Sequence, residues 1–345
     1  MNLSLNLNAK QKRILRYVGY AAFYLFALVF FAFLTFPFDR LRSRIQSEFN
    51  ASQTGPSPLT LRLGHLSSYW FSGVRADDVE LISPPSTVPP EDPAKPNKPK
   101  VMRLDTVHAR ASLLRLLFGT VHLNFGAEAF GGEISGFTSD ADGGRKLEVD
   151  IEDLGLANAP LLADMLGLPI GGELAGHVEF LLPEGKLSKA EGKVDLKFSG
   201  LSAGDGKTKV LNAIALPKVE VGDLTLKATA TAGGLKVDEL KAGGKDLELQ
   251  GDGSVRLRDN FDQSVLSLNA HFKFNDRFTN KDDMTRSLFG APGSSVPALF
   301  DMVPQNKHAK RPDGFYGWRV NGTFSHPTFV PGNGAAVGAP GGAAL

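Results

Sequence analysis

The chain has 345 residues, and its 38 lysines and arginines against 37 aspartates and glutamates leave a net charge of +1. A protein that binds a phosphate backbone usually carries an excess of basic residues, and in this chain the excess is a single residue. Nucleic acid is therefore not an expected partner. Cysteine is absent, which excludes disulfides, thiolate metal sites and cysteine nucleophiles.

An uncharged segment, residues 17–38, follows a short polar segment, residues 1–16. About 20 apolar residues suffice for a helix to cross the hydrocarbon core of a bilayer, so the segment predicts a transmembrane helix. The alternative is a cleaved signal peptide, but bulky residues follow the span where a cleavage site has small ones. Aromatic side chains mark the predicted anchor, namely Tyr17, Tyr20, Tyr24, Phe30, Phe31 and Phe36.

The charges around this span favour one orientation. Four basic residues precede it and three follow it closely, and a large polar domain after a first helix crosses largely regardless of its charge. We therefore expect residues 1–16 in the cytoplasm and the bulk of the chain on the other side of the membrane.

Residues 39–50 predict an amphipathic helix. Leu41, Ile45 and Phe49 recur every four residues and so share one helical face. Two interpretations are open: the helix lies on the lipid headgroups next to the membrane, or it forms the first turns of the following domain.

Beyond residue 60 the apolar period changes to two, which is typical of half-buried antiparallel strands. The longest alternation is 266–274, where Leu266, Leu268, Phe272 and Phe274 share one face. The sequence predicts a mainly β fold: a twisted antiparallel sheet over residues 60–330, of half-barrel or solenoid type, with a few short helices such as 112–118 and 160–166.

Turns and loops divide this β region. Four glycine pairs predict tight hairpin turns, at residues 131–132, 171–172, 233–234 and 243–244. The proline-rich segment 83–100 predicts an extended loop, residues 280–313 predict a surface excursion, and the Gly/Ala-rich tail 331–345 predicts disorder.

No catalytic or metal-binding motif emerges. The histidines lack the spacing of metal ligands, and His122, His177 and His271 alternate onto polar strand faces. Lys207 and Thr208 lack the upstream glycine of a phosphate-binding loop. We therefore expect no enzyme, no cofactor and no metal site.

Several segments carry a resemblance to a family. They are the span ending in Phe36-Pro37-Phe38-Asp39-Arg40-Leu41, the strand 101–105 leading through 109–114, the segment 129–136 and the closing segment 322–329. With these segments, the chain resembles the type II secretion system protein N (GspN) family. The same segments look like those of AsmA-type proteins, which are inner-membrane-anchored β-sheet proteins of the Gram-negative envelope.

The resemblance implies a location and a role. The protein would be a single-pass inner-membrane protein with its bulk in the periplasm, acting as an accessory component of the type II secretion system through contacts with the other secretion proteins. The alternative is an AsmA-like protein that binds or transfers lipid in an apolar β-groove. Leu266, Leu268, Phe272 and Phe274 would line that groove, whereas in an ordinary sheet they would be core residues under a helix.

Overall fold

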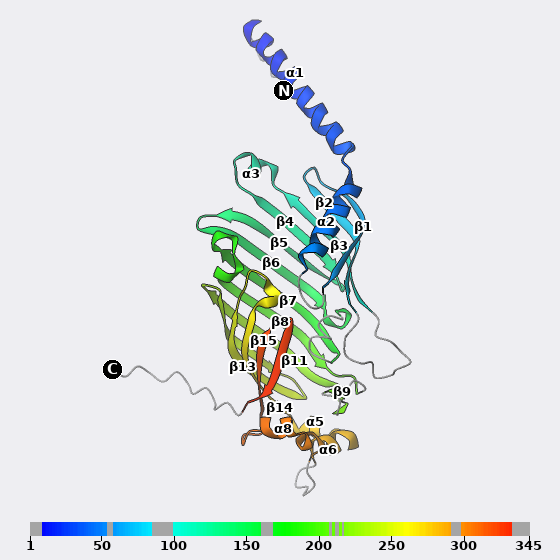
Figure 1. Ribbon diagram of the computed structural model, residues 1–345, viewed down its shortest axis with the longest axis vertical. Coiled ribbons are helices and arrows are strands. Elements are labelled where there is room, and N and C mark those ends of the chain that lie inside the picture. Colours follow the sequence, from blue (N-terminus) through cyan, green and yellow to red (C-terminus); the bar gives the residue numbers. More distant parts are fainter. Residues whose placement is uncertain are drawn as a thin grey trace, which may run out of the picture.

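The computed structural model describes residues 9–53, 58–84, 99–159, 168–206, 209–210, 214–215, 217–290 and 298–332. Its main element is an antiparallel sheet of fourteen strands (Figure 1). The strands are β1 (Thr60–Tyr69), β2 (Gly73–Ser83), β3 (Lys100–Ala111), β4 (His122–Ala129), β5 (Gly132–Ala141), β6 (Gly144–Gly155), β7 (Ile170–Leu182), β8 (Glu191–Ala203), β11 (Val219–Thr231), β12 (Gly234–Gly243), β13 (Leu247–Arg256), β14 (Val265–Phe274), β15 (Tyr316–Thr323) and β16 (His326–Pro331).

The remaining elements are short, apart from two helices at the N-terminal end. The α-helices are α1 (Ala9–Leu34), α2 (Phe38–Ser52), α3 (Leu113–Leu117), α5 (Asp276–Thr279), α6 (Asp283–Phe289), α7 (Leu299–Met302) and α8 (Pro304–Ala309). Single 3₁₀ turns cover Leu156–Asn158, Pro183–Gly185, Leu187–Lys189 and Phe261–Gln263, and β9 (Lys209–Val210) pairs with β10 (Ile214–Ala215) apart from the main sheet. The expectation of a mainly β fold with a few short helices is confirmed.

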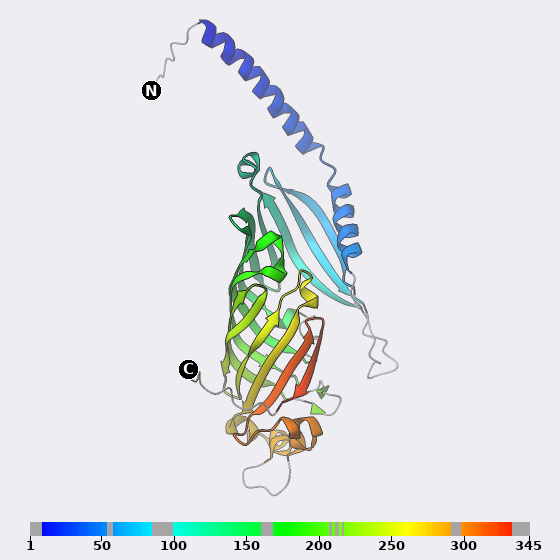
Figure 2. The ribbon, with the colours of Figure 1, turned by 60° about the vertical axis from the view of Figure 1, so that its left-hand side comes forward.

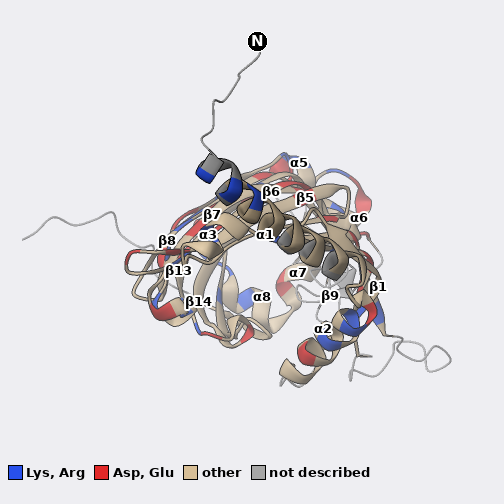
Figure 3. Ribbon diagram, turned by 90° about the horizontal axis from the view of Figure 1, so that it is seen from above, with Lys and Arg blue, Asp and Glu red and all other residues tan. Residues whose placement is uncertain are grey.

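Strand order in the sheet follows chain order, with β8 pairing directly with β11. Every strand therefore runs antiparallel to its neighbours. Viewed from above, the sheet curls through most of a circle, and its two end strands, β1 and β16, are not hydrogen-bonded to each other (Figure 3). Strands twist relative to their neighbours, and over fourteen strands this twist accumulates into curvature.

Helix α2 begins at Phe38, directly after Pro37, and packs on the first strands of the sheet. Phe38, Leu41 and Ile45 contact the buried cluster around Leu66 and Ala76. Two polar contacts fasten the helix to β1: Arg42 donates to the carbonyl of Gly64 at 2.8 Å, and the side-chain oxygen of Asn50 accepts from a β1 amide at 2.8 Å. The apolar face of α2 is therefore covered by the sheet rather than by lipid headgroups.

Two sequence expectations are wrong. The pair Gly171–Gly172 is no hairpin turn but lies inside β7, where the pairing with β8 shifts register and Gly172 has φ +124°. The described part of residues 280–313 is no surface excursion, because α6 buries Leu288 and α8 buries Asn306 and Ala309. Helices of four to seven residues are too short to show a 3.6-residue period, which is why the pattern was missed.

Other expectations have mixed outcomes. The turns at 131–132 and 233–234 join β4 to β5 and β11 to β12, and the turn at 243–244 follows β12, as predicted. Helix α3 confirms the helix expected within 112–118. The helix expected at 160–166, most of the loop 83–100 and nearly all of the tail 331–345 lie outside the described residues.

Candidate functional site

The register of the sheet brings apolar residues into continuous rows on one face. One row crosses all fourteen strands through directly paired residues. We call it the apolar row; its members are Ser68, Val74, Ala109, Phe125, Gly136, Val149, Val178, Val194, Ala228, Val237, Gly253, Leu268, Val320 and Phe329. Thirteen of these fourteen positions are apolar or glycine, so the whole sheet presents one apolar face.

The neighbouring row, one residue along, has the opposite character. From β3 to β16 it reads Arg110, Asn124, Phe137, Glu148, Glu179, Lys193, Thr229, Lys236, Ser254, Ser267, Asn321 and Thr328. Phe137 is the one apolar member. Because a one-residue slip would exchange the two faces, the contrast between the rows fixes the register strongly.

Glycines on the apolar face make room for their larger neighbours. A Cβ on Gly136 would lie 2.9 Å from the ring of Phe125, and a Cβ on Gly176 would lie 2.7 Å from the side chain of Leu196. The large side chains therefore pack over the glycine of the next strand and fill the space that a side chain would occupy there.

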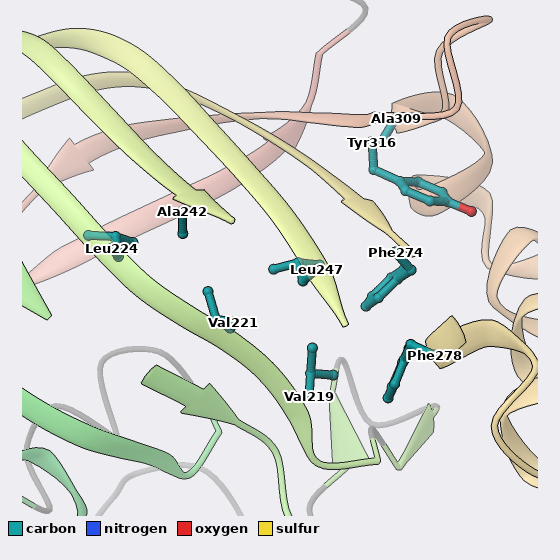
Figure 4. Close-up of a cluster of buried hydrophobic side chains, with 9 residues drawn as sticks. All are labelled: Val219, Val221, Leu224, Ala242, Leu247, Phe274, Phe278, Ala309 and Tyr316. Atoms are coloured by element: carbon teal, nitrogen blue, oxygen red, sulfur yellow. The ribbon is translucent and has the colours of Figure 1, made fainter. Parts of the chain in front are cut away.

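Helices α5 to α8 lie at the lower end of the sheet in Figures 1 and 2, where an aromatic cluster packs them on the apolar face. Phe274 of β14 lies 4.4 Å from Phe289 and 5.6 Å from Phe278, measured between ring centroids, and Phe300 and Tyr316 complete the cluster. Figure 4 shows Phe274, Phe278 and Tyr316 of this cluster together with buried side chains of β11, β12 and β13. The Tyr316 hydroxyl donates to Asp301 at 2.7 Å, and burial raises the pKa of this phenol.

The apolar face is half-buried over much of β4 to β8, whereas Phe180, Ala230 and Leu266 on the same face belong to a second buried cluster, against which Leu147, Val178 and Val194 pack. Among the described helices, α2 covers the face at β1 and β2, and α5 to α8 cover it at the lower end. Over β4 to β8 a set of large apolar side chains keeps part of its surface accessible: Leu123, Phe125, Leu147, Val149, Ile151, Val178, Val194 and Leu196. Apolar side chains that a second layer covers are usually fully buried, so these half-buried residues form the candidate binding surface.

The outer face of the sheet is polar and its charges are paired across strands. Lys146 bridges Glu148 at 3.0 Å and Glu179 at 2.8 Å. His177 contacts Asp150 at 2.6 Å, and this hydrogen bond raises the pKa of the imidazole. Glu148, Asp150 and His177 could together hold a cation by their spacing, but the ion pair with Lys146 already engages Glu148. The cluster is typical of a solvated strand surface.

The residues singled out from the sequence fall at two places. Leu266, Leu268, Phe272 and Phe274 lie on the apolar face of β14, where Leu266 and Phe274 are buried and Leu268 and Phe272 half-buried. The predicted anchor residues Tyr17, Tyr20, Tyr24, Phe30 and Phe31 are exposed on α1, and Phe36 is exposed just after it. The rest of the apolar row was not identified from the sequence, although the alternation of apolar and polar residues within each strand indicates which residues share its face.

Among the residues that the structure describes, none of the helices combines the length and the apolar character needed to cross a membrane. Comparison of the chain with known protein families, with curated proteins and with solved structures finds no match. The resemblance to the GspN and AsmA-type families therefore stays a prediction from the sequence.

Proposed function

We propose that the protein is a membrane-anchored protein of the cell envelope that holds lipid acyl chains against the apolar face of its curled sheet. The observation that carries this proposal is the apolar row, which crosses fourteen strands and stays half-buried over β4 to β8. Apolar surface of this extent is costly in water unless something covers it. The sheet would then act as an AsmA-like half-barrel, with its charged face toward solvent.

The anchor is part of the same proposal. The sequence holds 22 uncharged residues at 17–38, and Tyr17, Tyr20, Tyr24, Phe30 and Phe31 of α1 are exposed. Apolar side chains that no other part of the described chain covers fit a lipid environment. We place the β domain in the periplasm and the anchor in the inner membrane, as the resemblance implies.

A crosslinking experiment in living cells tests whether acyl chains occupy the apolar face. A benzophenone amino acid replaces Phe125 on the apolar row, and in a matched variant it replaces Phe137 on the polar face of the neighbouring strand. Both exchanges keep an aromatic ring at a half-buried position. We expect lipid adducts, detected by mass spectrometry, from position 125 and few from position 137. Equal yields at both positions, or none at 125, would refute the proposal.

Introducing a charge on the same face sharpens the test. Val149→Asp places a carboxylate two strands from Phe125 in the apolar row, whereas Asn124→Asp places one on the polar face of β4, beside Arg110. An ionised group buried under acyl chains costs several kcal/mol, which corresponds to more than a tenfold loss of lipid occupancy. We expect Val149→Asp to abolish adducts at position 125 and Asn124→Asp to leave them unchanged.

A second candidate function is the accessory role in type II secretion that the resemblance implies. Strand β16 favours it, because this end strand has one hydrogen-bonded neighbour in the sheet and exposes Phe329 and Val330. An edge strand of this kind can pair with a strand of another protein. Crosslinks from β16 to secretion proteins, with a secretion defect on deletion and no adducts at position 125, would favour this function over lipid binding.

A further inference from the structure

Large apolar side chains gather at the upper end of the sheet, opposite the aromatic cluster. They come from the turn between β1 and β2 and from the segment of α3 that joins β3 to β4. We call this group the apolar rim; its members and exposed fractions are Trp70 65%, Phe71 82%, Leu113 54%, Leu114 76%, Leu116 51%, Leu117 79%, Phe118 82% and Val121 45%.

The two segments of the rim form one body. The amide of Ala111, just before α3, donates to the carbonyl of Ser72 at 3.2 Å, and the Ser72 hydroxyl donates back to the carbonyl of Ala111 at 2.6 Å. The guanidinium of Arg110 lies 5.7 Å from the centroid of the Trp70 ring. Direct bonds therefore hold the tryptophan turn beside the leucines of α3.

The composition of the rim suits a lipid surface. Four of the five residues of α3 are exposed leucines, and Arg115 is its one polar residue. Neither 67–75 nor 109–122 contains an acidic residue, while Arg110 and Arg115 are basic; Arg75 is paired with Asp77 at 2.8 Å. Exposed apolar residues with a tryptophan and nearby cations are typical of surfaces that insert into the interface of an anionic bilayer.

The position of the rim indicates which membrane it would contact. In Figures 1 and 2 the rim lies at the end of the sheet where α1 passes into α2, and the helices α5 to α8 lie at the opposite end. We propose that the apolar rim inserts into the surface of the same membrane that holds α1, so that the apolar face of the sheet opens directly onto that bilayer. This inference rests on the proposed anchor and supplies a route by which acyl chains reach the sheet.

The two tryptophans of the chain allow this inference and the lipid-binding proposal to be tested separately. Trp70 lies in the rim, and Trp318 lies on the apolar face of β15. Trp318→Phe leaves Trp70 as the reporter of the rim, and Trp70→Phe leaves Trp318 as the reporter of the face. Each full-length variant is reconstituted into phosphatidylglycerol-containing liposomes, with and without lipids brominated on their acyl chains, and its fluorescence is recorded.

We expect bromine to quench Trp70 by at least half, and more strongly from shallow than from deep acyl positions. The variant Leu114→Asp/Leu117→Asp should reduce this quenching at least twofold. The matched variant Met284→Asp/Met302→Asp, which changes two exposed residues at the opposite end, should leave it unchanged.

Three results would overturn the inference. Red-shifted, unquenched Trp70 emission in protein that floats with the liposomes would show that the rim is in water although the protein is bound to the membrane. Blue-shifted but unquenched emission would show that protein, a partner or a second copy, covers the rim. Quenching of Trp318 without quenching of Trp70 would support binding of lipid to the apolar face and show that the rim does not contact the bilayer. Protein that fails to float at all would instead refute the proposed anchor.

Discussion

The aromatic cluster at the lower end of the sheet gives the sharpest test of the fold. Phe278 is fully buried, and its ring lies 5.6 Å from the rings of both Phe274 and Phe289. Truncating a buried phenylalanine to alanine costs about 3–5 kcal/mol, which is a large part of the roughly 5–15 kcal/mol that stabilises a domain. Helices of four to seven residues do not persist without such packing. We therefore expect Phe278→Ala to release α5 to α8 from the sheet.

Hydrogen exchange of the full-length protein in detergent measures this release. A loss of about 3–5 kcal/mol in local stability corresponds to exchange that is faster by roughly two to four orders of magnitude in residues 276–289 and 298–309. The matched control is Phe118→Ala, whose ring is 82% exposed and whose loss should change local stability by less than about 0.5 kcal/mol. Equal exchange in the two variants would show that the cluster does not hold the helices.

Three further substitutions have defined outcomes. Burial and a hydrogen bond raise the pKa of Tyr316, so the folded state keeps its proton and stability falls as the pH rises above about 10; Tyr316→Phe should remove this contribution in thermal unfolding. Asp150→Asn should lower the raised pKa of His177 toward its usual value in an NMR titration. Gly176→Ala would place a Cβ 2.4 Å from a backbone oxygen of β8 and should cost about 1–3 kcal/mol in urea unfolding.

Each of these outcomes has a contradicting result. An alkaline transition that is identical in Tyr316→Phe would show that this phenol is not linked to unfolding. Because folding raises the pKa of His177, its protonated form stabilises the folded state at pH values below the pKa of the unfolded chain. This contribution disappears as the pH rises through the pKa of the folded state. A His177 pKa that is the same in Asp150→Asn as in the parent would show that Asp150 does not raise it. A Gly176→Ala variant as stable as the parent would show that the strands separate at no cost.

The sequence predicted the sheet because its signal is local. Alternation within a strand such as 266–274 reveals one apolar and one polar face before any partner is known, and the glycine pair at 233–234 locates a hairpin. The apolar row required more, because its members come from fourteen strands and meet only through register. Register depends on every intervening turn and bulge, including the bulge at Gly172, which looks like a turn in the sequence.

The remaining features depend on contacts between distant segments. The rim joins the turn at Trp70 to α3 through Ser72 and Ala111, which are 39 residues apart. The aromatic cluster likewise joins a strand to helices of a few residues, whose sequences carry no periodic pattern. Neither the aromatic cluster nor the apolar rim could therefore be located before the chain was folded.

Helix α2 gives the last prediction, because it connects the proposed anchor to the sheet. Leu41 and Ile45 are half-buried against the cluster around Leu66, and covering each of them contributes about 1 kcal/mol. Leu41→Ala/Ile45→Ala should therefore speed hydrogen exchange in α2 at least tenfold and leave exchange in β6 to β8 unchanged.

The matched variant Ser43→Ala/Ser47→Ala has the same spacing on the exposed side of α2. Alanine has the higher helix propensity, so this variant should exchange no faster than the parent. Loosening α2 would also free the sheet to tilt away from the bilayer, so Leu41→Ala/Ile45→Ala should weaken the quenching of Trp70 by brominated lipid. Faster exchange with unchanged quenching would show that the rim stays on the membrane by its own contacts, and that α2 does not position it.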